Sequence, residues 1–254
     1  MTPPFTGVGV ALVTLFDARD RVLARATAEH AAALAGRGVQ AIVIAGTTGE
    51  AGYLDASDRR ELLAAVRLAV PDSLPVIVGT GDAVAARSLE LTRDAVEGGA
   101  AGVLVYPPGD EAPEPFFARA REVAGELAVI AYHFPKFFPA ISVQQLAALD
   151  VDGLKDSEGD AERLQHEAGS WDRAVYTGSA PLLSVAAGHG ATGAILALAN
   201  LHPELCLRAF AGNADAQREL LPEHEAIGAG GVAAIKRELA RRSGSPPYVR
   251  AADP

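Results

Sequence analysis

The sequence is poor in cysteine and in long apolar runs, and both shortages exclude broad classes of protein. Cys206 is the single cysteine in 254 residues, which excludes an intramolecular disulfide and a metal site built on several cysteines. The longest apolar stretches, such as residues 39–45, have the length of a β-strand and are far shorter than a membrane span. The N-terminus lacks a basic patch followed by an apolar run, the pattern of a secretory signal peptide. These features favour a cytoplasmic protein with no membrane partner.

Positive charge is also in short supply. The chain has 22 lysines and arginines against 32 aspartates and glutamates, which gives a formal net charge of −10. A surface with this balance repels a phosphate backbone, so nucleic acid is disfavoured as the main partner. The histidines are scattered along the chain without the spacing that is typical of a metal site. We therefore expect neither a nucleic-acid partner nor a bound metal.

A Gly-x-Gly-x-x-Gly motif is missing after the first predicted strand, which disfavours an open dinucleotide-binding sheet. Instead, short apolar runs alternate with segments of helical periodicity. The runs predict strands at residues 8–13, 39–45, 75–79, 102–105, 128–132, 153–155, 174–177 and 193–196. The segments between them predict helices at residues 27–37, 55–70, 84–98, 113–125, 143–149, 160–168 and 180–187. This alternation predicts an α/β fold, a (β/α)8 TIM barrel.

The barrel is predicted to occupy residues 1–201 and to carry a short C-terminal helical extension. Residues 202–254 indicate two or three further helices and a frayed, proline-containing end, packed on the barrel rather than folded as an independent domain. Local signals support the helix boundaries. Gly38 stands where a glycine ends a helix, and Asp55 can cap the start of the next one.

In a (β/α)8 barrel, catalytic residues gather where the strands end. Lys155 is the last residue of the sixth predicted strand, so its side chain faces either the barrel mouth or solvent. An amine shielded from water at the mouth can attack a carbonyl carbon. The alternative is a strand-end lysine that pairs with Asp156, and position alone does not separate the two.

Two further strand ends carry polar groups. Tyr132 ends the fifth strand beside the sixth, so its phenol can move a proton at Lys155; taken alone, a buried tyrosine is more often a packing residue. Residues 46–50, Gly-Thr-Thr-Gly-Glu, follow the second strand. Their glycines allow a tight turn with exposed N–H groups, and the Thr47 and Thr48 hydroxyls add donors for a carboxylate. The alternative for this segment is an ordinary turn between strand and helix.

In these motifs the chain resembles the dihydrodipicolinate synthase / N-acetylneuraminate lyase family of pyruvate-dependent class I aldolases. The matching segments are residues 46–50, residues 131–135 around Tyr132, and residues 153–157 around Lys155, with later matches at residues 177–179 and 191–195. Three motifs at three different strand ends make a chance agreement improbable. The resemblance implies a lyase that cleaves or condenses a 2-oxo acid, pyruvate plus an aldehyde, for example a 2-keto-3-deoxy sugar acid.

The resemblance also implies a role for individual residues. Lys155 would form a Schiff base with the 2-oxo acid, and Tyr132 would relay protons. Thr47 and Thr48 would bind the pyruvoyl carboxylate, with Thr47 also hydrogen-bonded to the phenol. Gly178 and Ile195 would line the pocket. The family uses no metal or organic cofactor in catalysis, and its members are commonly homo-oligomers, dimers or tetramers.

The chain departs from dihydrodipicolinate synthases at two places. Their relay tyrosine would fall near Gly109, and Tyr106 comes too early to take this role. Their arginine for the aldehyde's carboxylate should follow Pro135 closely, where this chain has Phe137 and a single nearby cation, Lys136. We therefore expect a different aldehyde partner.

Several alternatives stay open at this point. A dehydratase or hydratase-aldolase could use the same lysine, and dihydrodipicolinate synthase proper is a further possibility. A non-catalytic pyruvate-binding homologue is disfavoured, because binding alone needs no amine. His133 should face away from the barrel interior, where it either packs behind the sheet or touches substrate at the strand end. Phe137 and Phe138 form either part of the second-substrate pocket or a packed anchor of their loop.

Overall fold

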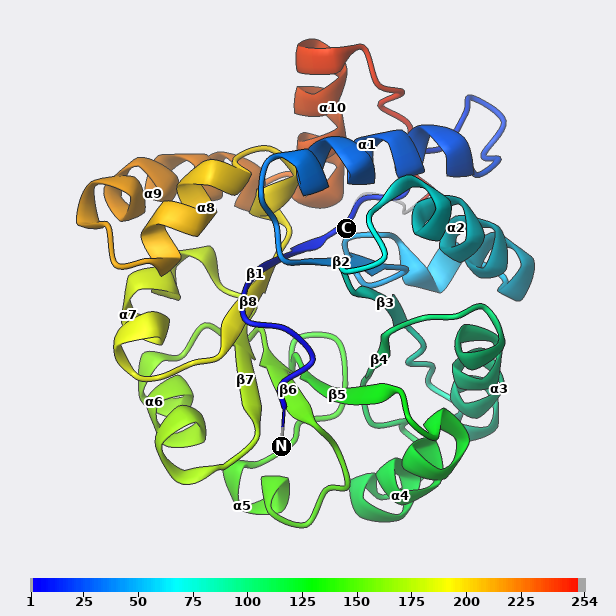
Figure 1. Cartoon of the computed structure of the whole chain (residues 1–254), viewed down its shortest axis with the longest axis vertical. Coiled ribbons are helices and arrows are strands. Elements are labelled where there is room, and N and C mark those ends of the chain that lie inside the picture. The colour runs from blue at the N-terminus through cyan, green and yellow to red at the C-terminus, as the bar shows by residue number, and fades with distance from the viewer. Residues whose placement is uncertain (1, 251–254) are drawn as a thin grey trace.

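Eight parallel strands close into a barrel in the computed structural model, which describes residues 2–250 (Figure 1). The strands are β1 (Gly7–Ala11), β2 (Ala41–Ile44), β3 (Val76–Gly79), β4 (Gly102–Val105), β5 (Ala128–His133), β6 (Gly153–Asp156), β7 (Ala174–Thr177) and β8 (Gly193–Leu196). Each strand pairs with the next, and β8 pairs with β1. The predicted (β/α)8 barrel is confirmed.

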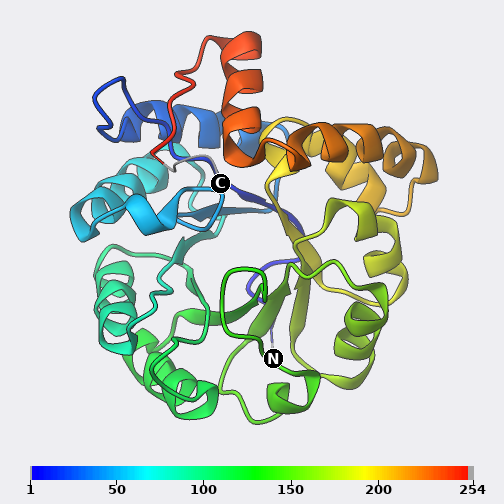
Figure 2. The same ribbon diagram turned by 180° about the vertical axis from the view of Figure 1, so that it is seen from behind.

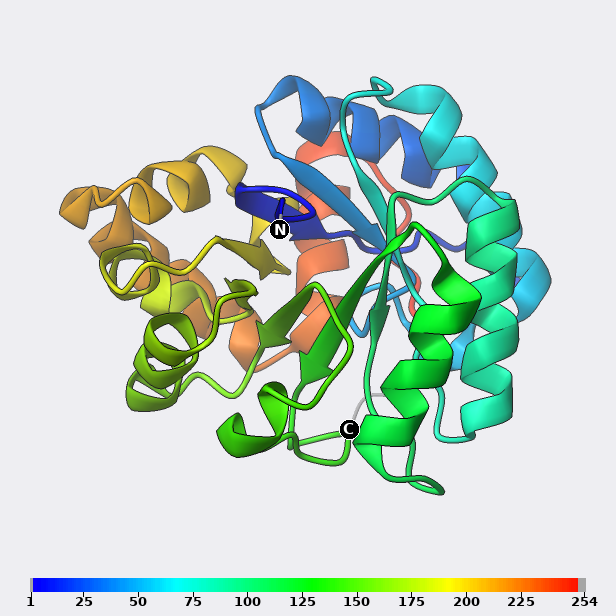
Figure 3. The same ribbon diagram turned by 60° about the horizontal axis from the view of Figure 1, so that its bottom comes forward.

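Helices cover the outer face of the strands, as Figures 1 and 3 show. They are α1 (Ala24–Gly36), α2 (Ala56–Ala69), α3 (Ala85–Glu97), α4 (Pro113–Ala124), α5 (Val143–Leu146), α6 (Ala161–Ser170) and α7 (Leu183–Gly188), with 3-10 turns η1 (Ala51–Tyr53), η2 (Ala180–Leu182) and η3 (Leu198–Asn200). The predicted caps are confirmed: Asp55 accepts the Asp58 N–H at 2.8 Å, and Gly38 follows α1 with a φ of +91°. The helix predicted at residues 180–187 instead divides into η2 and α7.

The barrel interior is a packed core that is closed at its N-terminal end. Inward side chains from several strands form one buried cluster, which includes Ile77, Leu104 and Ile195. Phe5 stacks on Tyr176 with ring centroids 4.5 Å apart, and the Tyr176 hydroxyl donates to the Phe5 carbonyl at 2.8 Å. These contacts plug the bottom of the barrel, so access to its interior is from the carboxyl ends of the strands.

Three helices follow the barrel, at the upper end of the predicted number: α8 (Pro203–Phe210), α9 (Ala214–Gly228) and α10 (Gly231–Ser243). Side chains of α8 and α9 join the core between the strands and the outer helices, and α10 packs Ile235 and Leu239 against Val13 and Leu15 beyond β1. The division into a barrel of residues 1–201 and an extension of residues 202–254 stays a prediction. Within residues 2–250, no helix combines the length and apolar character needed to cross a membrane.

The predicted fraying of the C-terminal end is wrong as far as Arg250; residues 251–254 lie outside the described part of the chain. The segment after α10 turns back towards η1 and α2 (Figure 2). Tyr248 forms an antiparallel bridge with Phe16, and the Arg250 N–H donates to Glu50 Oε2 at 2.6 Å. A buried carboxylate therefore anchors the segment, and nothing near Arg250 in the sequence signals this distant partner.

Lys236 completes this anchor from α10. The side chain is fully buried, its ammonium pairs with Glu50, and its Nζ donates to the Tyr248 carbonyl at 2.8 Å. Nζ also lies 4.3 Å from the centroid of the Phe16 ring. Burial lowers the pKa of the Lys236 amine, while the bond to Glu50 opposes this effect. The ion pair thus joins α10, the C-terminal segment and the loop after β2.

We expect Lys236→Met to destabilise the protein by about 3–5 kcal/mol, because it leaves the buried Glu50 carboxylate without its cation. Urea unfolding measures the change. Arg237→Met, at the exposed neighbouring position, is the control and should cost less than ~0.5 kcal/mol. The double variant Glu50→Gln with Lys236→Met should recover part of the loss. Equal costs for Lys236→Met and Arg237→Met would show that the pair contributes nothing.

Candidate active site

A cavity of about 750 Å³ opens at the carboxyl ends of the strands. We call it the rim cavity. Of the residues predicted for the site, Thr47, Thr48, Tyr132 and Gly178 line it. Lys155 and Ile195 do not: they are 5% and 1% exposed, and Ile195 belongs to the same interior cluster as Tyr132.

Lys155 lies directly beside Tyr132. The two residues are register partners on β6 and β5, and Lys155 Nζ is 4.3 Å from the centroid of the phenol ring. No carboxylate in the described part of the chain pairs with this amine. Asp156, on the other face of β6, instead accepts from Arg163 Nε at 2.7 Å. The alternative in which Lys155 pairs with Asp156 is therefore wrong, because successive residues of a strand point to opposite faces.

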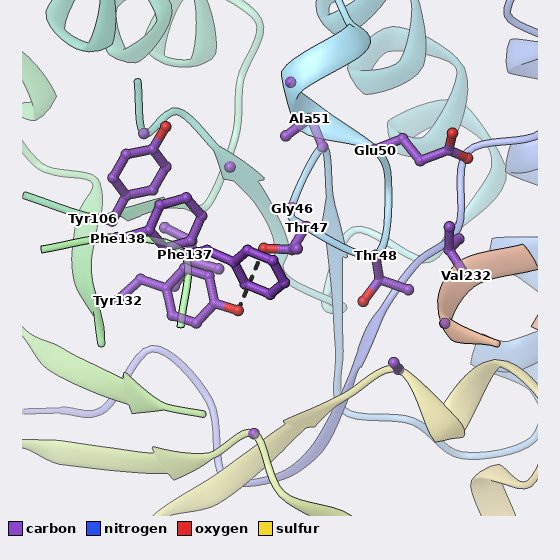
Figure 4. A pocket seen from close by; sticks show the side chains of 18 of the residues that line it. Gly46, Thr47, Thr48, Glu50, Ala51, Tyr106, Tyr132, Phe137, Phe138 and Val232 are labelled. Atoms are coloured by element: carbon purple, nitrogen blue, oxygen red, sulfur yellow. Dashed lines mark hydrogen bonds between the residues drawn. The ribbon is translucent and has the colours of Figure 1, made fainter. Parts of the chain in front are cut away.

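The Tyr132 hydroxyl reaches the loop after β2. It lies 3.4 Å from Thr47 Oγ1, the hydrogen bond drawn as a dashed line in Figure 4. This distance is at the long end for such a bond. Catalytic hydrogen bonds are often long in unliganded enzymes and shorten when substrate binds. A lysine, a phenol and a hydroxyl thus follow one another from the barrel interior to the rim cavity.

Residues 46–50, which we call the threonine loop, are held in an unusual backbone conformation. Left-handed backbone occurs just before the loop at Ala45 and at its last residue, Glu50, with φ of +51° and +58°. Gly79 packs so closely that an added Cβ would lie 2.1 Å from the Ala45 carbonyl oxygen. Among the described residues, no group accepts a hydrogen bond from the N–H of Thr47 or Thr48. Unpaired N–H groups and hydroxyls on a fixed loop are suited to bind an anion.

Side chains from neighbouring elements fix the threonine loop. The Thr14 hydroxyl donates to the Gly49 carbonyl at 2.8 Å, and Arg59 Nη2 donates to the Ala51 carbonyl at 2.7 Å. The Glu50 carboxylate points away from the threonine hydroxyls, as Figure 4 shows, and binds Lys236. The last residue of the motif therefore lines the cavity but turns its carboxylate to Lys236, which supports the loop.

An aromatic cluster forms one wall of the rim cavity (Figure 4). Tyr106 and Phe138 stack with ring centroids 3.7 Å apart and an interplanar angle of 7°. Phe137 lines the same wall and is 57% exposed. Lys136 is exposed, lies outside the lining, and has its Nζ 5.4 Å from the Phe137 ring centroid.

His133 holds the loop that carries these rings, residues 134–141, which we call the aromatic loop. The side chain is buried on the face of β5 opposite to Tyr132, as strand alternation predicts. Its Nδ1 accepts the Ile141 N–H at 3.1 Å, so Nε2 carries the proton and donates to Glu158 at 2.9 Å. Arg163 Nη2 donates to the Ile141 carbonyl at 2.7 Å. His133 is thus an anchor of the cavity wall and not a substrate contact.

The same layer holds the one group of side chains in residues 2–250 that is arranged like metal ligands. Ligand atoms of His133, Asp156 and Glu158 lie within 4.8 Å of one another. Arg163 Nε lies 2.7 Å from Asp156 and 3.6 Å from Glu158, so a guanidinium already supplies the positive charge. The arrangement is therefore an ion-pair network behind β5 and β6.

The sequence did not indicate the part of the cavity that the C-terminal helices build. This part is lined by His224 and Ile227 of α9 and by Val232 of α10. Figure 4 shows Val232 across from Phe137 and Phe138 of the aromatic loop. One signal was present for α10: Val232, Ile235 and Leu239 recur at helical spacing, and Lys236 lies on that apolar face. A lysine on such a face indicates a buried partner but not which residue it is.

Fold and site together define a barrel enzyme whose polar groups lie where (β/α)8 enzymes place their chemistry. A family model described as the dihydrodipicolinate synthetase family matches residues 4–224. The 4-hydroxy-tetrahydrodipicolinate synthase of Corynebacterium diphtheriae is 33% identical over 229 residues, which cover 85% of this chain and 76% of that protein. The chain therefore belongs to the dihydrodipicolinate synthase / N-acetylneuraminate lyase family, and it is a carbon–carbon lyase of the class I aldolase type.

Solved structures agree on the fold. A monomeric dihydrodipicolinate synthase variant matches with a TM-score of 0.87 and 24% identity, over 97% of this chain and 90% of that one. YagE of E. coli K12, a family member solved in complex with pyruvate, matches with a TM-score of 0.88 and 23% identity, over 98% and 93%.

The network behind the site contains one carboxyl group that should titrate abnormally. Glu167 of α6 has no exposed surface, and its Oε1 lies 2.8 Å from Arg163 Nε, which also serves Asp156. Burial, reinforced by the negative charge of Asp156, raises the pKa of Glu167 to about 9. The folded protein therefore keeps a proton that the unfolded chain releases near the ordinary glutamate pKa, so stability falls as pH rises between these values.

Glu167→Gln should remove this pH dependence, because glutamine is neutral at every pH. Between about pH 6 and pH 8 the free energy of unfolding of the native protein should fall by up to ~2.7 kcal/mol relative to that of the variant. This is the largest change that the release of one proton can cause over two pH units. Urea unfolding at a series of pH values measures the difference. Glu162→Gln, an exposed position on the same helix, is the control. Parallel stability curves for the native protein and Glu167→Gln would contradict the assignment.

Proposed function

We propose that the chain is a Schiff-base aldolase in which Lys155 binds pyruvate covalently and the resulting enamine joins an aldehyde, or the reverse. The observation that carries the proposal is the position of Lys155, a buried amine without an ion-pair partner among the described residues and in register with Tyr132. The pyruvate complex of YagE supports the choice of 2-oxo acid. Lys155, Tyr132 and Thr47 are the proposed catalytic residues.

The carboxylate of pyruvate is proposed to bind the threonine loop. The Thr47 and Thr48 hydroxyls and their N–H groups are donors that require no movement of the backbone. With the carboxylate bound there, the C2 carbonyl would point towards Lys155 Nζ and the Tyr132 hydroxyl. Gly178 lines the wall, where an added Cβ would lie 2.0 Å from Ser157 Oγ, and Ile195 would support the ketone from the barrel interior.

The residues provide each proton transfer that the reaction needs. Lys155 Nζ attacks C2, the carbinolamine loses water, and the Tyr132 phenol donates the proton to the departing hydroxyl. The Tyr132 phenolate left by this step takes a proton from C3, which gives the enamine, and C3 then attacks the aldehyde carbon. Thr47 holds the phenol in position and can pass its proton to solvent through the rim cavity. Hydrolysis of the imine returns the free lysine.

A dehydratase or hydratase-aldolase would use the same enamine, so it remains the second candidate. Dihydrodipicolinate synthase proper is disfavoured by Phe137 and by the exposed position of Lys136. A purely binding homologue would not need the Lys155 amine. We further propose a cytoplasmic enzyme that works without a metal or organic cofactor, and a homo-oligomer, dimer or tetramer.

Incubation with pyruvate and borohydride should add a reduced three-carbon adduct to the intact protein, and the adduct should be absent from Lys155→Ala. Mass spectrometry of the intact chain and its peptides measures it. Lys136→Ala is the matched control and should keep the adduct, because Lys136 is exposed and outside the cavity lining. An adduct that persists in Lys155→Ala, or maps to Lys136 or Lys236, would sink the assignment.

Tyr132→Phe should keep the fold and the carboxylate site and lose the proton relay. We expect kcat to fall by roughly 10²–10⁴-fold, the contribution that a general acid–base group makes to the rate. The KM for pyruvate should change little. Steady-state kinetics measure both constants. Tyr248→Phe removes a phenol from the C-terminal segment and should leave kcat near that of the native enzyme. Near-normal turnover of Tyr132→Phe would reduce this phenol to a packing role.

A further inference from the structure

The rim cavity is much larger than pyruvate needs. At about 750 Å³ it lies within the range that holds drug-sized ligands, roughly 300–1,000 Å³. The threonine loop, Tyr132 and Gly178 account for the pyruvate end only. The remaining lining extends from the aromatic loop to η3, α9 and α10, and it is the space left for the second substrate.

This remaining space has apolar walls. On the side of the aromatic loop, Phe137 offers a partly exposed ring next to the stacked pair of Tyr106 and Phe138. η3 and the C-terminal helices add four apolar side chains to the lining, Leu198, Ile227, Val232 and Ile235. Aromatic rings stack favourably on such surfaces, and the gain is beyond that of apolar burial alone.

Basic side chains near the cavity are bound elsewhere. Arg59 donates to backbone carbonyls of the threonine-loop region, and Arg87 pairs with Glu90 at 3.1 Å. Lys136 lies outside the lining. Asp82 is part of the lining and gives it a negative charge. His224 is the remaining basic side chain of the described lining, and it can hydrogen-bond to a substituent on a ring. A carboxylate on the second substrate would therefore find an opposite charge only by drawing the half-exposed Arg87 away from Glu90; elsewhere in the described lining it would be desolvated without one, which is unfavourable.

We infer that the second substrate is an uncharged aldehyde with an aromatic body, held between the Phe137 ring and the wall of Ile227 and Val232. The inference rests on the proposed function and specifies its substrate class. C3 of the enamine forms a bond to the aldehyde carbon, and the aldehyde oxygen takes a proton from the Tyr132 phenol. The proton it gives is the one its phenolate took from C3 when the enamine formed, and the phenol is restored by a proton of the water that hydrolyses the imine. With one water, imine hydrolysis then returns Lys155 and releases a 4-aryl-4-hydroxy-2-oxo acid.

A comparison of three aldehydes as second substrates tests the inference directly. The native enzyme is given pyruvate with benzaldehyde, aspartate semialdehyde or glyceraldehyde, and product formation is followed by NMR. We expect kcat/KM for benzaldehyde to exceed that for aspartate semialdehyde by about 10²-fold or more, since a buried carboxylate would lack a partner. Equal or higher kcat/KM for either of the other two aldehydes would overturn the inference.

Two substitutions locate the selectivity. Phe137→Arg should lower kcat/KM for benzaldehyde and raise that for aspartate semialdehyde, whereas Phe137→Leu should lower the first without raising the second. Val232→Asp should lower kcat/KM for benzaldehyde by roughly tenfold or more. Leu68→Asp makes the same change at a 90% exposed position on α2 and should leave it unchanged. Unaltered ratios in both Phe137→Arg and Val232→Asp would place the second substrate elsewhere.

Pyruvate alone separates this inference from the proposed function. Each variant is tested for the borohydride adduct and for exchange of the C3 protons of pyruvate with deuterated water, which reports the enamine without any aldehyde. A native enzyme with neither signal contradicts the Schiff-base proposal itself. A native enzyme with both signals that prefers charged or sugar-like aldehydes contradicts the aromatic substrate only.

Discussion

The strict alternation of side chains across β5 and β6 determines both the chemistry of the barrel and the support behind it. Tyr132 and Lys155 are register partners that face inward, and the next residue on each strand, His133 and Asp156, faces outward. A slip of one residue in either strand would exchange these faces. Of the inward pair, Tyr132 lines the cavity and Lys155 lies buried beside it, while the outward pair joins Arg163 in the ion-pair network.

The two faces are coupled through the aromatic loop. Ile141, at the end of this loop, is held at its N–H by His133 and at its carbonyl by Arg163. The outward residues of the strands therefore fix a loop whose rings lie on the inward side, next to the Tyr132 phenol. Because Phe138 stacks on Tyr106 of the neighbouring strand end, the loop is held from both sides. The shape of the cavity wall thus depends on residues that never contact it.

Much of the fold and the polar centre of the site could be predicted from the sequence, because both depend on local patterns. Strand-length apolar runs gave the barrel, and strand ends indicated Thr47, Tyr132 and Lys155. The remaining features depend on contacts between residues that are far apart in the chain, such as Glu50 with Lys236. Helical periodicity shows that position 236 is buried but cannot identify a partner that the closure of the barrel brings near. The same holds for the wall that α9 and α10 contribute to the cavity.

The threonine loop shows why those distant contacts matter for the chemistry. The N–H groups of Thr47 and Thr48 have no acceptor among the described residues, and left-handed backbone at Ala45 and Glu50 costs about 1–3 kcal/mol at each residue, so the loop depends on support from outside. Thr14 holds the Gly49 carbonyl, Arg59 holds the Ala51 carbonyl just after the loop, and Lys236 holds its final side chain from a helix near the end of the chain. α10 therefore has two effects on one cavity: through Lys236 it stabilises the loop proposed to bind the carboxylate, and through Val232 it adds an apolar side chain to the lining on the side away from the aromatic rings. The C-terminal helices are in this sense part of the site, although none of the proposed catalytic residues lies in them.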